Sequence, residues 1–147
     1  MSDHSAHAEA LIADLDSGGS SASQEAVFSL AELGDAAVVP LLAVIGRLTV
    51  GGQRRALDVL HRLPHVAAAA AAPDRFVAEA LLPLLDSDDD VVVGWTADAL
   101  AHFRVVEAVP KLAQALHRVE EAGVPGDWAG PAGLRRALAL LRSSAAS

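Results

Sequence analysis

Apolar residues recur along the chain at intervals of three and four, which is the spacing of one face of an α-helix. The first two apolar stripes are Ala8, Leu11, Ile12 and Leu15, and then Ala26, Val27, Leu30 and Leu33. Glycine and proline separate the stripes, as expected where glycine ends one helix and proline begins another. The pattern predicts eight helices, over approximately 5–16, 21–33, 35–48, 53–63, 73–85, 91–103, 105–122 and 133–143.

Short polar sequences mark the starts of two of these helices. In Ser21-Ala22-Ser23-Gln24 we expect Ser21 to cap the helix and Gln24 to reach back to it, as in a capping box. The acidic turn 86–90 gives a second capping signal. Between helices, we expect a break at 49–52 and the longest irregular segment at 123–131.

The sequence is similar to itself when it is shifted by 70 residues, so that Leu30 aligns with Leu100 and Pro40 with Pro110. This shift, which we call the repeat offset, corresponds to two periods of about 35 residues, the range of helical-hairpin repeats. A middle copy fits with a different spacing, because the alanine-rich run 66–72 lies between its two helices. A half copy closes the chain, since 135–138 echoes 54–57.

The repeated unit has the form Asp-x-x-Val-x-x-x-x-Ala-x-Ala-Leu and then Ala-Val-Pro-x-Leu-x-x-x-Leu, at 89–100 and 108–116. It resembles the HEAT repeat, especially its short bacterial form, and Leu33-Gly34-Asp35 looks like the usual inter-helix turn of that family. Val93 stands where the family often has arginine. The resemblance covers roughly 22–143. It implies an all-α fold, a right-handed α-solenoid of about three helical hairpins with capping helices, and a binding role.

On this basis we expect a single repeat domain over 1–147. Its expected parts are an N-terminal capping helix (1–19), repeat 1 (20–50), repeat 2 with the alanine-rich insertion (51–87), repeat 3 (88–122), a loop with a C-terminal capping helix (123–143), and a tail (144–147).

Composition supports a helical fold and narrows the chemistry. Alanine and leucine, the best helix formers, number 32 and 21. The chain has no cysteine, which excludes disulfides and thiolate metal sites. The net charge is −8, and residues 1–50 alone carry seven acids against the single base Arg47. Such an acidic balance argues against binding to nucleic acid or to an anionic membrane.

Several clusters could suggest a site, and each has a simpler structural explanation. The pairs His4/His7 and His61/His65 have helical spacing but too few ligands for a metal. The acids of 86–90 lack the glycine and glutamate of a calcium loop and suit the start of the next helix. The arginine pairs at 54–55 and 135–136 are expected on the surface. No catalytic or phosphate-binding motif is present, so we predict no enzyme and no cofactor.

The most informative pattern concerns the second helix of each hairpin, which lines the inner face of a HEAT-like solenoid. In the third repeat the positions expected on this face are polar, whereas the equivalent positions of the first repeat are apolar. We therefore predict a partner-binding face with an apolar floor, a polar edge and a loop contact. The floor is Leu41, Val44, Ala80 and Leu84, the edge is Lys111, Gln114 and Arg118, and the loop contact is Trp128.

Three coverings of this apolar floor are open. The N-terminal helix or the alanine-rich run could fold over it, a second copy of the chain could pack on it, or a partner helix or peptide could bind there. Trp95 lies at the edge of its helix's apolar stripe and is expected to pack in the core. Trp128, in a Gly/Pro-rich loop, is the better candidate for contact with a partner.

The sequence thus predicts a non-catalytic protein-interaction module, an adaptor or scaffold. Its expected partner is another protein or a helical peptide, with a homo-oligomer possible and no role for nucleic acid or membrane. Alternatives are an immunity-type inhibitor of a bacterial toxin, an accessory subunit of a biosynthetic enzyme and, further off, a HEAT-like DNA-binding protein. Because the start carries no targeting segment and runs such as 38–46 are too short to span a bilayer, we expect a bacterial, cytoplasmic protein.

Overall fold

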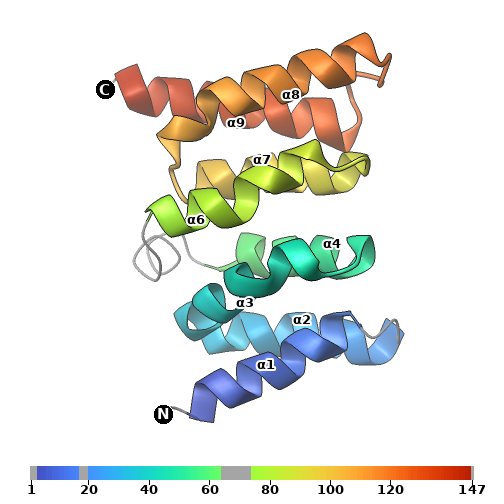
Figure 1. The fold of residues 1–147 in the computed structure, drawn as a ribbon, viewed down its shortest axis with the longest axis vertical. Helices are drawn as coiled ribbons and strands as arrows, with labels where there is room; N and C mark the ends of the chain where they lie inside the picture. The colour runs from blue at the N-terminus through green and yellow to red at the C-terminus, as the bar shows by residue number, and fades with distance from the viewer. Residues whose placement is uncertain (1–2, 17–19, 64–73, 147) are drawn as a thin grey trace. The chain divides into compact units, whose positions relative to one another are not determined.

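Helices are the only regular structure in the part of the chain that the computed structural model describes, residues 3–16, 20–63 and 74–146. The prediction of an all-α protein is therefore confirmed for these residues (Figure 1). The chain divides into two units, Met1–Pro73 (unit 1) and Asp74–Ser147 (unit 2). This boundary falls inside the segment 51–87 that we predicted as the second repeat.

In unit 1, α2 packs against both α1 and α4, and α1 also contacts α3. The core is made of leucine, isoleucine and small apolar residues, with Leu15, Leu30, Leu41, Ile45 and Leu60 fully buried. The elements are α1 (Asp3–Leu15), α2 (Ser20–Leu33), the 3₁₀ turn η1 (Gly34–Ala37), α3 (Val38–Val44), the 3₁₀ turn η2 (Ile45–Arg47) and α4 (Val50–Arg62).

In unit 2, α9 packs along α7 and α8, and the 3₁₀ turn η3 contacts α6, α7 and α8. Leu81, Leu85, Leu100, Leu112 and Leu134 are fully buried in its core. The elements are α6 (Asp74–Leu81), η3 (Leu82–Asp86), α7 (Asp90–His102), the 3₁₀ turn η4 (Val106–Ala108), α8 (Val109–Glu121) and α9 (Ala129–Ala146).

The repeat offset relates the two units in detail. It carries Gly34 at the end of α2 onto Arg104 at the end of α7, and both have a left-handed backbone, with φ of 66° and 61°. After α7, the Arg104 N–H donates to the Ala101 carbonyl and the Val105 N–H to the Leu100 carbonyl, each at 3.0 Å. This is the Schellman pattern of helix ends, which favours glycine at the position that Arg104 occupies.

Glycines allow α7 and α9 to approach closely. A Cβ atom on Gly94 would lie 2.1 Å from the Ala129 carbonyl oxygen, and one on Gly133 would lie 2.6 Å from the Gly94 carbonyl oxygen. Neither distance leaves room for a side chain, so glycine at both positions is a packing requirement.

Two predicted helix starts were wrong, because the glycines and proline that we interpreted as breaks lie in the first turns of α4 and α9. The predicted break at 49–52 is instead the start of α4, where the Thr49 hydroxyl accepts from the Gly52 N–H at 3.1 Å. The segment predicted as irregular to residue 131 already includes the start of α9 at Ala129. Ser21 lies inside α2 rather than capping it. The acidic capping signal is confirmed, because the Asp89 side chain accepts from the Val92 N–H at 3.0 Å.

One stretch of the described residues, Ser21–Arg47, passes a test for membrane helices by length and composition, with a mean hydropathy of 1.8. The stretch is longer than the apolar runs on which the sequence prediction was based. Core helices of soluble proteins pass the same test, and here Gly34 interrupts the stretch with a left-handed turn between α2 and α3. The alanine-rich run 66–72, predicted as one possible cover for the floor, lies outside the described residues.

Candidate functional site

The eight predicted partner-binding residues divide between the units and differ in exposure. Leu41 in unit 1 and Leu84 in unit 2 are buried, at 0% and 5% exposure. Neither residue lies on an exposed floor, because α1 packs against α3 and η3 packs against α7 and α8. For Leu41 this is the covering by the N-terminal helix that the sequence left open. Val44 and Ala80 are partly exposed, and Lys111, Gln114, Arg118 and Trp128 are exposed.

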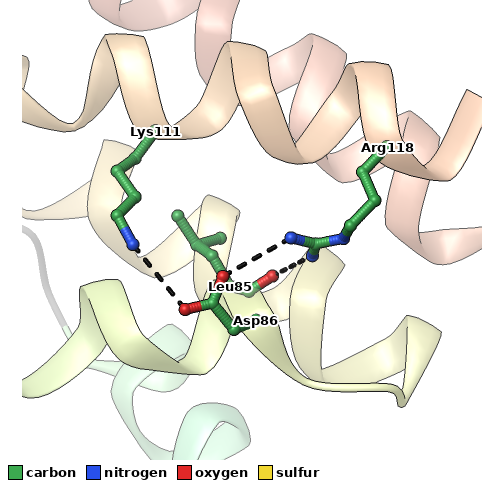
Figure 2. A network of polar contacts seen from close by, with 4 residues as sticks. All are labelled: Leu85, Asp86, Lys111 and Arg118. Carbon is green, nitrogen blue, oxygen red and sulfur yellow. Dashed lines mark hydrogen bonds and ion pairs between the residues drawn. The ribbon is translucent and has the colours of Figure 1, made fainter.

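Two residues of the predicted polar edge, Lys111 and Arg118, make contacts within their own unit (Figure 2). The Lys111 ammonium lies 3.7 Å from one oxygen of the Asp86 carboxylate, and the Arg118 guanidinium lies 3.4 Å from the other. Arg118 also donates to the Leu85 carbonyl oxygen at the end of η3. Two cations on α8 thus hold the end of η3, with Arg118 satisfying a carbonyl that the helix end leaves free. Lys111 and Arg118 therefore have a structural role.

The equivalent region of unit 1 is an open, mostly apolar groove of about 580 Å³, which we call the α1/α3 groove. Val44 is the one residue of the predicted floor that lines it. Among the described lining residues, carboxylates occur only on the α1 side, and the α3 side is uncharged. These residues are Glu9, Ile12, Ala13 and Asp16 from α1 and its end, and Pro40, Ala43, Val44 and Leu48 from α3 and the residues after it.

The end of α1 is held by α4 and the residue that caps it. One oxygen of the Asp16 carboxylate accepts from the Thr49 N–H at 2.9 Å and from the Thr49 hydroxyl at 2.6 Å. Arg55 donates to the Leu15 carbonyl at 2.5 Å. Gly52 permits this arrangement, because a Cβ atom there would lie 2.3 Å from Asp16 Oδ1.

Equivalent carbonyl groups in the two units accept hydrogen bonds from arginines on different helices. The repeat offset carries Leu15 onto Leu85, and the carbonyl of each accepts from an arginine. That arginine is Arg55 of α4 in unit 1 and Arg118 of α8 in unit 2. In unit 1 the place of Arg118 is taken by Leu48, so this position supplies no cation to reach across the groove toward α1.

Sequence reasoning missed the α1 side of the groove, because it considered the first helix as a cap or as a cover for the floor and not as a wall of the site. The available signal was the spacing of Glu9 and Asp16 on either side of the apolar Ile12. A smaller pocket of about 220 Å³ lies between α2 and α4. Beside it, the Arg62 guanidinium stands 5.0 Å from the centre of the exposed Phe28 ring, within the range of a cation–π contact.

The tryptophans are more exposed than a core role requires. Trp95, which we expected in the core, is 39% exposed, and Trp128 is 54% exposed. The Trp128 carbonyl accepts from the Ala132 N–H at 3.0 Å, so its backbone closes the first turn of α9 while its indole stays at the surface. The indole of Trp128 is therefore accessible for contact with another molecule.

Arg136 and Asp98 form an ion pair that joins α9 to α7. Arg136 of α9 makes a two-fold contact with the Asp98 carboxylate, at 3.0 and 2.7 Å, and the hydrogen bond to Asp98 raises the pKa of Arg136 above its usual value. Among these residues no three of the His, Asp and Glu side chains gather as metal ligands would. No family model, curated protein or solved structure matches the chain.

Proposed function

We propose that this chain is a HEAT-like helical-repeat protein that works as a non-catalytic protein-binding module. The repeated motifs and the helical content support the first part. The α1/α3 groove is the observation that carries the second, because it is an apolar cleft of about 580 Å³. Clefts of this size and composition accommodate ligands, and a groove between two helices suits an incoming amphipathic helix.

The comparison of the units supports this choice of surface. In unit 2 the corresponding positions carry Lys111 and Arg118, which reach across to Asp86. Their counterparts Leu41 and Leu48 leave the groove of unit 1 without such a bridge. Since unit 2 keeps a similar set of helices with charged residues there, the fold does not need the groove to be open and apolar. A cytoplasmic location is part of this proposal.

The proposal is tested by blocking the groove without changing the core. Ala43 lines the groove and is exposed, so Ala43→Gln adds a bulky neutral side chain to a helix surface. Ala139→Gln on α9 is the matched control, since Ala139 is also exposed on a helix. Both variants are expected to keep the wild-type unfolding midpoint, because surface substitutions of this kind change stability by about 0.5 kcal/mol or less.

Tagged wild-type and variant chains are then used to capture proteins from an extract of the organism that encodes them. We expect at least one protein to be enriched on the wild type and on Ala139→Gln, and to fall several-fold on Ala43→Gln. If every enriched protein is retained equally by Ala43→Gln, the groove is not the binding surface and the proposal is wrong.

A further inference from the structure

Two acids of the first helix recur in unit 2, but the cations that pair with them there have no counterparts in unit 1. The repeat offset carries Glu9 onto Glu79 and Asp16 onto Asp86. In unit 2 both acids are paired: Glu79 lies 3.2 Å from Arg75, and Asp86 contacts the side chains of Lys111 and Arg118.

The corresponding positions in unit 1 carry no positive charge. The residues that stand in the places of Arg75, Lys111 and Arg118 are Ser5, Leu41 and Leu48. Glu9 and Asp16 form no ion pair with any residue that the structure describes, and the Asp16 carboxylate has only its hydrogen bonds to Thr49 among these residues. Unit 1 therefore keeps both acids but lacks the three cations that pair with them in unit 2.

These two acids lie on the wall of the α1/α3 groove. Both line it, with Ile12 and Ala13 between them. Glu9 and Asp16 are seven residues apart, about two helical turns or roughly 10 Å along the axis. Lys111 and Arg118, which both pair with Asp86, are also seven residues apart on one helix. Two cations at this spacing on a helix alongside α1 have the same axial separation as Glu9 and Asp16.

From this comparison we propose that the α1/α3 groove binds a basic amphipathic helix of a partner protein. Apolar side chains of that helix cover the floor at Ile12 and Val44. Two lysine or arginine side chains, seven residues apart at one edge of its apolar stripe, pair with Glu9 and Asp16. The partner thereby supplies charges that unit 2 carries itself. The net charge of residues 1–50, with seven acids and one base, favours encounter with such a partner.

This inference rests on the proposed function, because it assigns the chemistry of a ligand to the same groove. The probe is a capped, Ala-based peptide of about 15 residues, long enough to form a helix, with a leucine stripe and two lysines seven residues apart at its edge. A second peptide has glutamine in place of both lysines. Binding of each labelled peptide to the full chain is measured by fluorescence anisotropy at low ionic strength.

We expect the lysine peptide to bind the wild-type chain about tenfold more tightly than the glutamine peptide, as two exposed ion pairs allow. Glu9→Gln combined with Asp16→Asn should remove this preference. Asp86→Asn, which neutralises the equivalent carboxylate of unit 2, is the matched control and should leave binding unchanged. Leu48→Arg places a cation where unit 2 has Arg118, and it should weaken binding of the lysine peptide about tenfold.

Three results would overturn the inference. The first is equal binding of the two peptides, and the second is a loss of binding by Asp86→Asn as large as that of the double variant. The third is the absence of binding by the lysine peptide. If both peptides bind equally and Ala43→Gln abolishes binding of both, the groove accepts a helix without selecting its charge. The inference then fails while the proposed function stands, and the capture experiment judges that function separately.

Discussion

Replacing Gly94 with alanine tests the close approach of α7 and α9. The new Cβ atom would lie 2.1 Å from the Ala129 carbonyl oxygen and 2.6 Å from its carbon, whereas ordinary contacts begin at about 3.4 Å. The clashing atoms belong to the backbone, so no side-chain rotation relieves the contact and the two helices must move apart. Overpacking of a well-packed interior costs about 1–3 kcal/mol, and a backbone clash belongs at the upper end.

We therefore expect Gly94→Ala to lower the free energy of unfolding by about 3 kcal/mol, and the melting midpoint by roughly 10 °C for a chain of this size. Urea and thermal unfolding followed by circular dichroism at 222 nm measure both quantities. Gly46→Ala is the control, because no described atom lies within 4 Å of a Cβ atom there, and it should not destabilise. A Gly94→Ala variant within about 0.5 kcal/mol of the wild type, the range of an ordinary surface substitution, would refute the close packing of α7 and α9.

Two further substitutions address single positions. Gly34→Ala should cost about 1 kcal/mol, because the left-handed φ of 66° penalises any Cβ even though its space is empty; a variant as stable as wild type in urea would contradict the left-handed turn. Thr96→Val should stabilise by about 1 kcal/mol, because Thr96 is fully buried in α7 and its hydroxyl has no hydrogen-bond partner among the described residues. A loss of stability in the same assay would mean that the hydroxyl is bonded.

The all-helical fold and part of the core were predictable, because apolar and turn positions recur at a fixed offset in the sequence. Leu30 and Leu100 are both buried in the cores of their units, as the offset implies. The boundaries at the glycines were not predictable in the same way. Gly52 and Gly130 favour a break when judged by helix propensity alone, but each lies in a helix where a neighbouring carboxylate leaves no room for a side chain. This lack of space for a side chain cannot be predicted without knowing which group of another helix lies next to the glycine.

The candidate site was predicted in part. The contrast between Leu41 and Lys111 indicated a position where the fold accepts either an apolar or a charged residue, and this led to α3, whose residues line the α1/α3 groove. The prediction could not show that Leu41 points into the core under α1, nor that Lys111 reaches Asp86. Both facts depend on which helix lies opposite, which a periodic pattern on a single helix does not contain.

The arginine that donates to the Leu15 carbonyl lies on α4, whereas the one that donates to the equivalent Leu85 carbonyl lies on α8. This difference limits which segments the two units can exchange. If α3 and the residues after it replaced α8, the Leu85 carbonyl would lose Arg118. The α9 residue that matches Arg55 is Arg136, which is held by Asp98. A helix-by-helix crossover would therefore strand an acceptor, whereas exchange of a whole unit keeps each carbonyl with its own donor. A piece that contains both the carbonyl and its arginine, from α1 to α4 in unit 1 or from η3 to α8 in unit 2, keeps this hydrogen bond when it is moved.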